Sequence, residues 1–174
     1  MTADTILIRP LTVADAGAWR RLRLRALTDS PEAFSSSPED EAHLSDAEIA
    51  ARAAPTPPGI VFGAFGKGEL GGMATYLPNT RLKTRHKATM AGVYVAPAFR
   101  RTGTGRRLVE HVIDHAGGLG VILQCVVAVE NAAARNLYRS LGFRPYGIER
   151  NAVFWNGRYV DDELLALDLR RGQS

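Results

Sequence analysis

The stretch Val93-Tyr-Val-Ala-Pro-Ala-Phe-Arg-Arg-Thr-Gly-Thr-Gly105 runs from a strand-like tripeptide into two arginines and a spaced pair of glycines. The β-branched residues favour a strand, Pro97 ends it, and an apolar stripe at helical spacing follows the glycines. A loop that opens a helix leaves backbone N–H groups without intrahelical partners, and glycine lets a ligand approach them closely. Because the helix dipole also favours negative charge there, the stretch predicts a site for an anion such as a pyrophosphate.

The glycine spacing also narrows the kind of anion site. A dinucleotide fingerprint needs a third glycine, and a Walker loop needs Gly-Lys-Ser/Thr after a longer spacer. Neither pattern is present around Gly103 and Gly105. Nicotinamide and nucleoside-triphosphate sites therefore lose support.

The stretch lies inside a strand, helix, strand unit. We expect a strand over Ala88–Val95, a helix over Gly103–Ala116, and a second strand over Val121–Val129. A right-handed crossover of this kind makes the two strands parallel. The second strand is nearly all apolar without alternation, a pattern typical of a strand that is covered on both faces.

The flanking segments predict antiparallel strands and further helices, while Ser35–Glu41 is polar and is predicted as a surface connection. The chain is thus predicted as a single domain over residues 1–174 with an α/β (α+β) fold. The fold is a mixed, mostly antiparallel sheet of about seven strands, in which strands 4 and 5 are parallel, with about four helices on both faces. The expected elements are a short strand around Ile6 and Ile8, helices from Thr12 to about Asp29 and from Ser45 to before Pro55, hairpin strands Ile60–Phe65 and Gly72–Leu77, a helix over Ala132–Leu141, and a final hairpin that turns at Asn156-Gly157 and ends in Leu164–Leu169.

Composition and charge bound the class of protein. The chain has 174 residues, one cysteine and a net charge of +4, which suits a globular domain in a reducing compartment. No signal peptide and no bilayer-spanning apolar run are visible, so we expect a cytoplasmic protein without a membrane partner. The arginines between Arg20 and Arg25 are interpreted as the solvated face of a helix.

A second motif follows the buried strand: Asn131-Ala-Ala-Ala-Arg-Asn-Leu-Tyr-Arg-Ser-Leu-Gly-Phe143. Capping and packing explain Asn131 and Gly142, but they do not explain why a tyrosine stands at position 138. Together the two motifs resemble the GNAT superfamily of acyl-CoA-dependent N-acyltransferases, with its Arg/Gln-x-x-Gly-x-Gly/Ala loop and its Asn-x-x-Ala-x-x-Leu-Tyr-x-x-x-Gly-Phe motif. The order of predicted elements resembles that fold over essentially the whole chain.

This resemblance implies acetyl-CoA as co-substrate, no metal, and a sheet whose parallel pair splays to admit the acyl-pantetheine arm. It places the arm along the backbone of Val93 to Val95, the pyrophosphate on the N–H groups of Arg101 to Arg106, and Asn131 beside the arm. Asn136 or Arg135 would lie near the 3′-phosphate, and Tyr138 would face the sulfur. The residues assigned to the cofactor are Val93, Tyr94, Val95, Arg100, Arg101, Thr102, Gly103, Thr104, Gly105, Arg106, Asn131, Arg135, Asn136 and Tyr138.

The implied reaction is attack of a primary amine on the thioester carbonyl. The Val95 N–H would be the oxyanion donor and Tyr138 the general acid that protonates the leaving thiolate. Many family members carry a Glu or His base on the fourth or fifth strand, but this chain has neither there. His86 and Glu130 are the remaining candidates for the base, and a water chain is the alternative.

The acceptor is expected to be an amine of a small molecule, a peptide or a protein, and the sequence does not choose among them. Its groove would lie between Phe34–Ala54 and Arg150–Tyr159, with Tyr76, Phe154 and Trp155 as further aromatic candidates. The acidic runs Glu39–Glu41 and Asp161–Glu163 would attract a cationic amine. Family members are often dimers, so a homodimer is implied.

Two other function classes compete with the enzyme. A non-catalytic acyl-CoA sensor of the same fold is one, although it would not require Tyr138. A basic nucleic-acid-binding module is the other, and Arg20–Arg25 is its only independent support, because the arginines near Gly103 belong to a loop suited to one small anion. We therefore expect no nucleic-acid partner.

Overall fold

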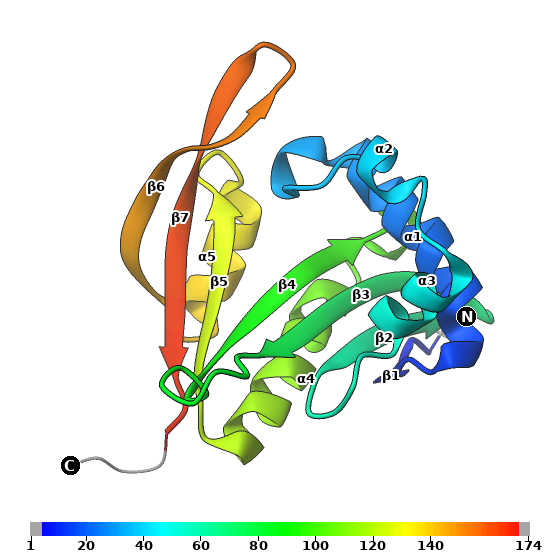
Figure 1. Cartoon of the computed structure of the whole chain (residues 1–174), viewed down its shortest axis with the longest axis horizontal. Coiled ribbons are helices and arrows are strands. Elements are labelled where there is room, and N and C mark those ends of the chain that lie inside the picture. The colour runs from blue at the N-terminus through cyan, green and yellow to red at the C-terminus, as the bar shows by residue number, and fades with distance from the viewer. Residues whose placement is uncertain (1–4, 171–174) are drawn as a thin grey trace.

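The computed structural model describes residues 5–170, and within them seven strands form one sheet in the order β1-β2-β3-β4-β5-β7-β6. Figure 1 shows this sheet with helices packed on both of its sides. The strands are β1 (Leu7–Pro10), β2 (Ile60–Gly66), β3 (Glu69–Pro78), β4 (Lys87–Val95), β5 (Ile122–Ala128), β6 (Arg144–Trp155) and β7 (Arg158–Asp168). The helices are α1 (Ala16–Asp29), α2 (Pro38–Glu41), α3 (Asp46–Ala53), α4 (Thr104–Leu119) and α5 (Ala132–Ser140), with short 3-10 turns η1 (Val13–Asp15), η2 (Pro31–Ala33) and η3 (Pro97–Phe99).

Strand alternation divides the apolar residues between two cores. On β2, Phe62 faces a core that contains Leu108 and Val112 of α4, whereas its neighbour Val61 faces a second core that contains Trp19 of α1. Successive side chains of a strand point to opposite faces, so each central strand supplies both cores. The α4 and α5 helices therefore cover one face of the sheet, and α1 and α3 cover the other.

The parallel pair β4–β5 is joined for only three positions, from Lys87 with Ile122 to Thr89 with Gln124. Beyond Thr89 the two strands separate, as Figure 1 shows between the green β4 and the yellow β5. The expected parallel fourth and fifth strands are confirmed, and so is their separation.

A β-bulge in β4 bends this strand where it leaves β5. Tyr94 pairs with Met73 and Ala91 pairs with Thr75, so β4 carries one more residue than β3 between these positions. Gly92 lies inside the bulge with φ 59°, a left-handed conformation that favours glycine. Because a bulge kinks its strand and increases the local twist, it directs the end of β4 away from β5. A glycine inside a strand pattern is a sequence signal for such a bulge.

Two expectations about local structure are wrong. Pro38–Glu41 forms the short helix α2, which Ser37 and Asp40 begin with a capping box: the Ser37 N–H donates to Asp40 at 2.8 Å. The segment Ser35–Glu41 is thus not a plain connection. On β5, Val126 is 55% exposed, so this strand is not covered on both faces along its whole length.

The final hairpin turns as predicted at Asn156 and Gly157, which have φ values of 50° and 76°. Two residues with positive φ suit the type I′ turn of a tight hairpin. Within residues 5–170, no helix combines the length and the apolar character that crossing a bilayer requires.

Candidate functional site

A cleft of about 800 Å³ occupies the region where β4 and β5 separate. Its walls come from β4 and β5, from α5, from the β6–β7 hairpin, and from the segment around Phe34. A volume of this size suits a small-molecule site. We call it the splay cleft.

The loop before α4 has unpaired backbone donors at the edge of this cleft. Within residues 5–170, the six consecutive N–H groups from Arg101 to Arg106 donate to no acceptor of the chain, and the first helical bond in α4 runs from the Arg107 N–H to the Gly103 carbonyl at 3.1 Å. Gly105 also lines the cleft. Six free N–H groups at a helix start form a cradle for an anion.

Local side-chain bonds hold this loop in shape. The Thr102 hydroxyl donates to the Phe99 carbonyl at 2.7 Å, so the Thr104 hydroxyl is the donor in the 2.7 Å bond between the two threonines. Arg101 and Gly103 both have positive φ, at 63° and 78°. A left-handed conformation at a non-glycine residue such as Arg101 costs about 1–2 kcal/mol, and the threonine bonds help to maintain it. The threonine side chains shape the loop, and its backbone offers the free donors.

The edge of β4 that no longer pairs with β5 also carries a backbone N–H group that points away from β3. The Ala96 N–H donates to the Gly71 carbonyl on β3 at 2.8 Å. Because consecutive N–H groups of a strand point to opposite edges, the Val95 N–H points toward the splay cleft. The Val95 carbonyl, on the same edge, accepts from Nε of Arg100 at 2.9 Å.

Tyr138 lines the cleft from α5 and is 6% exposed. Burial, with a smaller contribution from Cys125, raises the pKa of the Tyr138 phenol well above its usual value. Burial alone raises the pKa of Cys125 to about 12. No acceptor or donor for the Tyr138 hydroxyl occurs in the described part of the chain. The site therefore contains a protonated phenol that remains available to a ligand.

The other predicted residues of α5 divide between the cleft and the sheet. Asn131 lines the cleft and caps α5, because its side-chain oxygen accepts from the Ala134 N–H at 3.1 Å. Arg135 does not line it, and its guanidinium donates to Glu163 at 3.1 Å and to the Val129 carbonyl at 3.0 Å. The structure thus argues against Arg135 as a phosphate ligand. Asn136 is exposed and makes no side-chain bond within residues 5–170.

Neither predicted base reaches the splay cleft. His86 is exposed and precedes β4 at the end where the parallel pair is closed, since its carbonyl accepts from the Ile122 N–H at 2.8 Å. Glu130 is bound by Arg158 at 2.8 Å on the protein surface. Both lie outside the cleft lining, so these two expectations do not fit the geometry.

Two carboxylates that were not predicted as bases line the cleft instead: Glu149 on β6 and Asp162 on β7. They are cross-strand partners in the β6–β7 ladder. The pKa of Asp162 is raised, chiefly by burial and to a smaller extent by the nearby charges of Glu149 and Asp161. Long-range strand register creates this pair, so periodicity could not reveal it.

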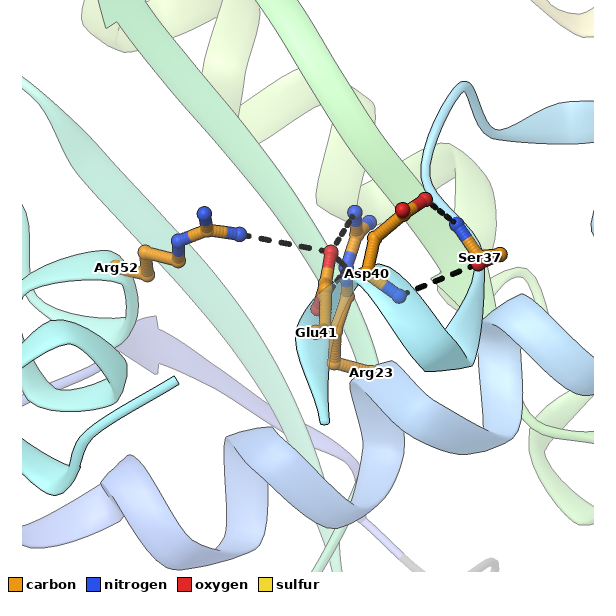
Figure 2. A network of polar contacts seen from close by, with 5 residues as sticks. All are labelled: Arg23, Ser37, Asp40, Glu41 and Arg52. Atoms are coloured by element: carbon orange, nitrogen blue, oxygen red, sulfur yellow. Dashed lines mark hydrogen bonds and ion pairs between the residues drawn. The ribbon is translucent and has the colours of Figure 1, made fainter. Parts of the chain in front are cut away.

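Figure 2 shows a buried ion pair between Arg23 and Glu41, which lies at the N-terminal wall of the cleft because Arg23 lines it. Glu41 is 5% exposed, receives Nη2 of Arg23 at 2.7 Å, and lies 3.5 Å from Nη1 of Arg52. The Arg23 guanidinium also lies 4.9 Å from the centre of the Phe34 ring, and both side chains line the cleft. Arg23 is therefore not a solvated arginine as expected, and Glu41 is not free to attract an amine.

A second cavity of about 220 Å³ adjoins the first, and Phe34 and Val153 line both. The aromatic residues Phe154 and Trp155 line this second cavity. Tyr159 packs on Phe154 with ring centres 4.8 Å apart. Tyr76 does not contribute, because it is 1% exposed and belongs to the core on the α4 side.

Comparison with known proteins relates the sequence of this chain to acetyltransferases. The model of the acetyltransferase (GNAT) family matches residues 19–143. The [ribosomal protein bS18]-alanine N-acetyltransferase of Salmonella typhimurium is 47% identical over 84 residues, which are 48% of this chain and 57% of that protein. The chain thus spans little more than half the length of this relative.

Solved structures agree over nearly the whole chain. The ribosomal-protein-alanine N-acetyltransferase of Brucella melitensis is 26% identical with a TM-score of 0.80, covering 93% of this chain and 99% of its own. A phosphinothricin acetyltransferase of Sinorhizobium meliloti, in complex with acetyl-CoA, has a TM-score of 0.83 at 21% identity and covers 97% of this chain and 91% of its own. At that identity the second similarity concerns the fold.

Proposed function

Because the chain belongs to the acetyltransferase (GNAT) family, we propose that it transfers the acetyl group of acetyl-CoA to the N-terminal α-amine of a peptide or protein. The observation that carries the proposal is the run of six unpaired N–H groups from Arg101 to Arg106 at the edge of the splay cleft. A diphosphate needs several convergent donors, and this loop supplies them without side chains. We take residues 1–174 as one catalytic domain.

The rest of the cofactor fits the remaining walls. The free edge of β4 from Val93 to Val95 would bind the pantetheine arm through its backbone, and the Asn131 amide would donate to the arm. Asn136, whose side chain is unbonded within residues 5–170, is the candidate for the 3′-phosphate in place of Arg135. Arg100 and Arg106 are exposed beside the loop and add positive charge.

In the proposed reaction, acetyl-CoA supplies a thioester carbonyl that an amine attacks. The Val95 N–H would donate to the developing oxyanion, a contribution that typically changes the rate about 10²–10³-fold. Tyr138 would give its proton to the leaving thiolate. Its raised pKa keeps the phenol protonated at neutral pH, so the proton is present when the sulfur leaves.

The acceptor class follows from two observations. Two of the proteins named above, from Salmonella typhimurium and Brucella melitensis, are by name alanine N-acetyltransferases of a ribosomal protein. The second cavity, lined by Phe154 and Trp155, lengthens the cleft beyond what a small amine fills. A peptide N-terminus would place its amine in the splay cleft and its following side chains in the second cavity.

The test combines cofactor binding with an amine panel. Acetyl-CoA at about 100 times its Kd should stabilise the fold by about 2.7 kcal/mol, which thermal unfolding detects. A peptide with a free N-terminal alanine should release CoA. The same peptide with a blocked N-terminus and an internal lysine should not.

A matched pair of variants tests the loop. A Cβ at Gly105 would make only ordinary contacts, the nearest at 3.7 Å to Val95, and Gly118 on the same helix faces open space. Gly105→Val should therefore fold but lose the stabilisation by acetyl-CoA, because its methyl groups fill the space of the diphosphate. Gly118→Val should keep it. Stabilisation by acetyl-CoA without CoA release from any amine would instead favour the non-catalytic sensor.

A further inference from the structure

The carboxylates of the C-terminal half differ in whether an arginine binds them. Six acidic residues lie between positions 130 and 168. Four of them are bound by arginines: Glu130 by Arg158, Asp161 by Arg150, Glu163 by Arg135 and Arg139, and Asp168 by Arg170. The other two, Glu149 and Asp162, have no hydrogen bond or ion pair through their carboxylates in the described part of the chain. They are also the two that line the splay cleft.

The sheet holds these two carboxylates side by side. Glu149 and Asp162 are directly opposite in the antiparallel β6–β7 ladder, and Asp162 also pairs with Ala128 of β5. Opposite residues point to the same face with Cβ atoms roughly 4.5–5.5 Å apart. A bulge in β6 directly follows Glu149, and Asp161 stabilises it by accepting from the Asn151 N–H at 2.8 Å. Strand pairing and the bulge thus fix the backbone positions of Glu149 and Asp162.

Like charges directly opposite each other destabilise a sheet, whereas an acid opposite a cation stabilises it. The Glu149–Asp162 pair is therefore unfavourable for the fold itself. Within residues 5–170, the other ionisable side chains that line the cleft are Arg23, Tyr94, Arg100, Cys125 and Tyr138. The Tyr94 hydroxyl donates to Asp29. Arg23 is bound to Glu41, and Arg100 is bound to the Val95 carbonyl. Tyr138, at 6% exposure, is an unpartnered phenol in the same cleft. A cationic donor is the ligand group that two adjacent carboxylates bind most strongly, and the phenol can take part in a further hydrogen bond.

We propose that Glu149 and Asp162 receive the ammonium form of the acceptor and remove its first proton, which makes them the general base of the reaction. This inference rests on the proposed function and supplies the base that neither His86 nor Glu130 can provide from its position. The carboxylate pair binds the cation while both groups are charged. Two carboxylates in contact share a proton readily, because protonation of one relieves the repulsion between them.

The proton balance of the step is complete. One proton moves from the ammonium to the carboxylate pair, and the nitrogen lone pair then forms the bond to the thioester carbon. When the carbon–sulfur bond breaks, the sulfur takes the electron pair and accepts the Tyr138 proton. The second nitrogen proton leaves as the amide forms and restores the phenol, and the carboxylate pair releases its proton to solvent.

The chemistry of the pair also favours one class of amine. An N-terminal α-amine has a pKa of about 7.7–8.0, whereas a lysine side chain has one of about 10.4. A carboxyl group with a moderately raised pKa deprotonates the first far more readily than the second. The pair therefore selects α-amines over lysine side chains.

The test uses the full chain with acetyl-CoA and the free-alanine peptide. Asp162→Asn and Glu149→Gln should each lower kcat/KM at least about a hundredfold, as expected for loss of a general base. Asp168→Asn is the matched control, since this carboxylate lies on the same strand but pairs with Arg170 outside the cleft. It should keep kcat/KM within about threefold.

The pH profile adds a readout that a structural role would not change. The acid limb of kcat/KM should move to lower pH in Glu149→Gln, because Asp162 loses its negative neighbour. Carbon-13 NMR titration of the carboxyl groups, which needs no activity, should show the same downward shift. Unchanged kcat/KM in both variants of an active enzyme, or no change in the titration of Asp162 in Glu149→Gln, would overturn the inference while the proposed function stands. Absence of CoA release by the wild-type chain would overturn both.

Discussion

Asp162 and Glu163 are neighbours on β7, yet their surroundings are opposite. Glu163 is 5% exposed and accepts from Arg139 at 2.6 Å and from Arg135 at 3.1 Å. Its hydrogen bonds to Arg135 are the main reason that its pKa is lowered. Asp162 faces the splay cleft, lacks a cation in the described residues, and has a raised pKa. The alternation of a strand thus assigns one carboxylate to the stability of the fold and the next to the cleft.

Two tyrosines show the same contrast. The Tyr94 hydroxyl donates to Asp29 at 2.6 Å and ties β4 to the end of α1. The Tyr138 hydroxyl has no protein partner within residues 5–170. Buried polar groups are normally satisfied, so an unsatisfied one in a cleft indicates a place for a ligand. Both tyrosines line the cleft, but the protein holds the Tyr94 hydroxyl and leaves the Tyr138 hydroxyl available to a ligand.

The largest expected effect concerns the tyrosines. Tyr138→Phe should lower kcat about 10²–10⁴-fold with acetyl-CoA affinity retained, because only the proton donor is lost. Tyr94→Phe should leave kcat nearly unchanged and cost about 1 kcal/mol of stability through its lost hydrogen bond. Steady-state kinetics and urea unfolding measure the two quantities. Equal kcat losses in the two variants would remove the distinction between paired and unpaired tyrosines.

Variants of the neighbouring carboxylates Asp162 and Glu163 should differ in the free energy of unfolding as well as in rate. Glu163→Gln should lower the free energy of unfolding by about 2 kcal/mol, since two arginines lose a charged acceptor. That loss is smaller than for a fully buried pair because the Arg139 side chain is 43% exposed. Asp162→Asn should not lower the free energy of unfolding, because it removes the repulsion between Asp162 and Glu149. Denaturant unfolding at pH 7 compares them, and a stability loss in Asp162→Asn equal to that in Glu163→Gln would contradict the assignment.

The smallest expected effect is the pH dependence of the stability difference between the wild type and Asp162→Asn. The folded-state pKa of Asp162 is raised, so the folded chain binds this proton more tightly than the unfolded chain does. The wild type therefore loses stability as pH rises from the unfolded value, about 4, through the folded pKa. Asp162→Asn should lack this loss, and its advantage, below about 1 kcal/mol, should grow with pH. Unfolding curves between pH 4 and pH 8 measure it, and a constant difference would exclude Asp162 as its source.

Much of the fold, and the loop of free N–H groups before α4, could be predicted because the signals are local. The anion loop is a contiguous stretch of backbone, and Tyr138 stands at a fixed spacing from Asn131 on one helix. Helix periodicity, strand alternation and the Asn156-Gly157 turn are likewise set by neighbouring residues. The parallel pair followed from the order of elements along the chain.

The predictions that failed concern groups whose partners are distant in sequence. Arg135 binds Glu163 and Arg23 binds Glu41, and in both cases tertiary packing removes a cation that looked available. Two further features have local signals in the sequence: Gly92 indicates the bulge of β4, and Ser37 with Asp40 indicates the start of α2. Local patterns would have been sufficient for these two features.

The amino-acid order alone thus determined the anion loop, the helix that carries Tyr138 and the mixed sheet, because each depends on interactions within a short segment. Tertiary structure decided which acids remain unpaired. Glu149 and Asp162 are thirteen positions apart and meet only through the register of β6 and β7, which the whole sheet fixes by burying one face of each strand. The side of the cleft that these two carboxylates line depends on that register.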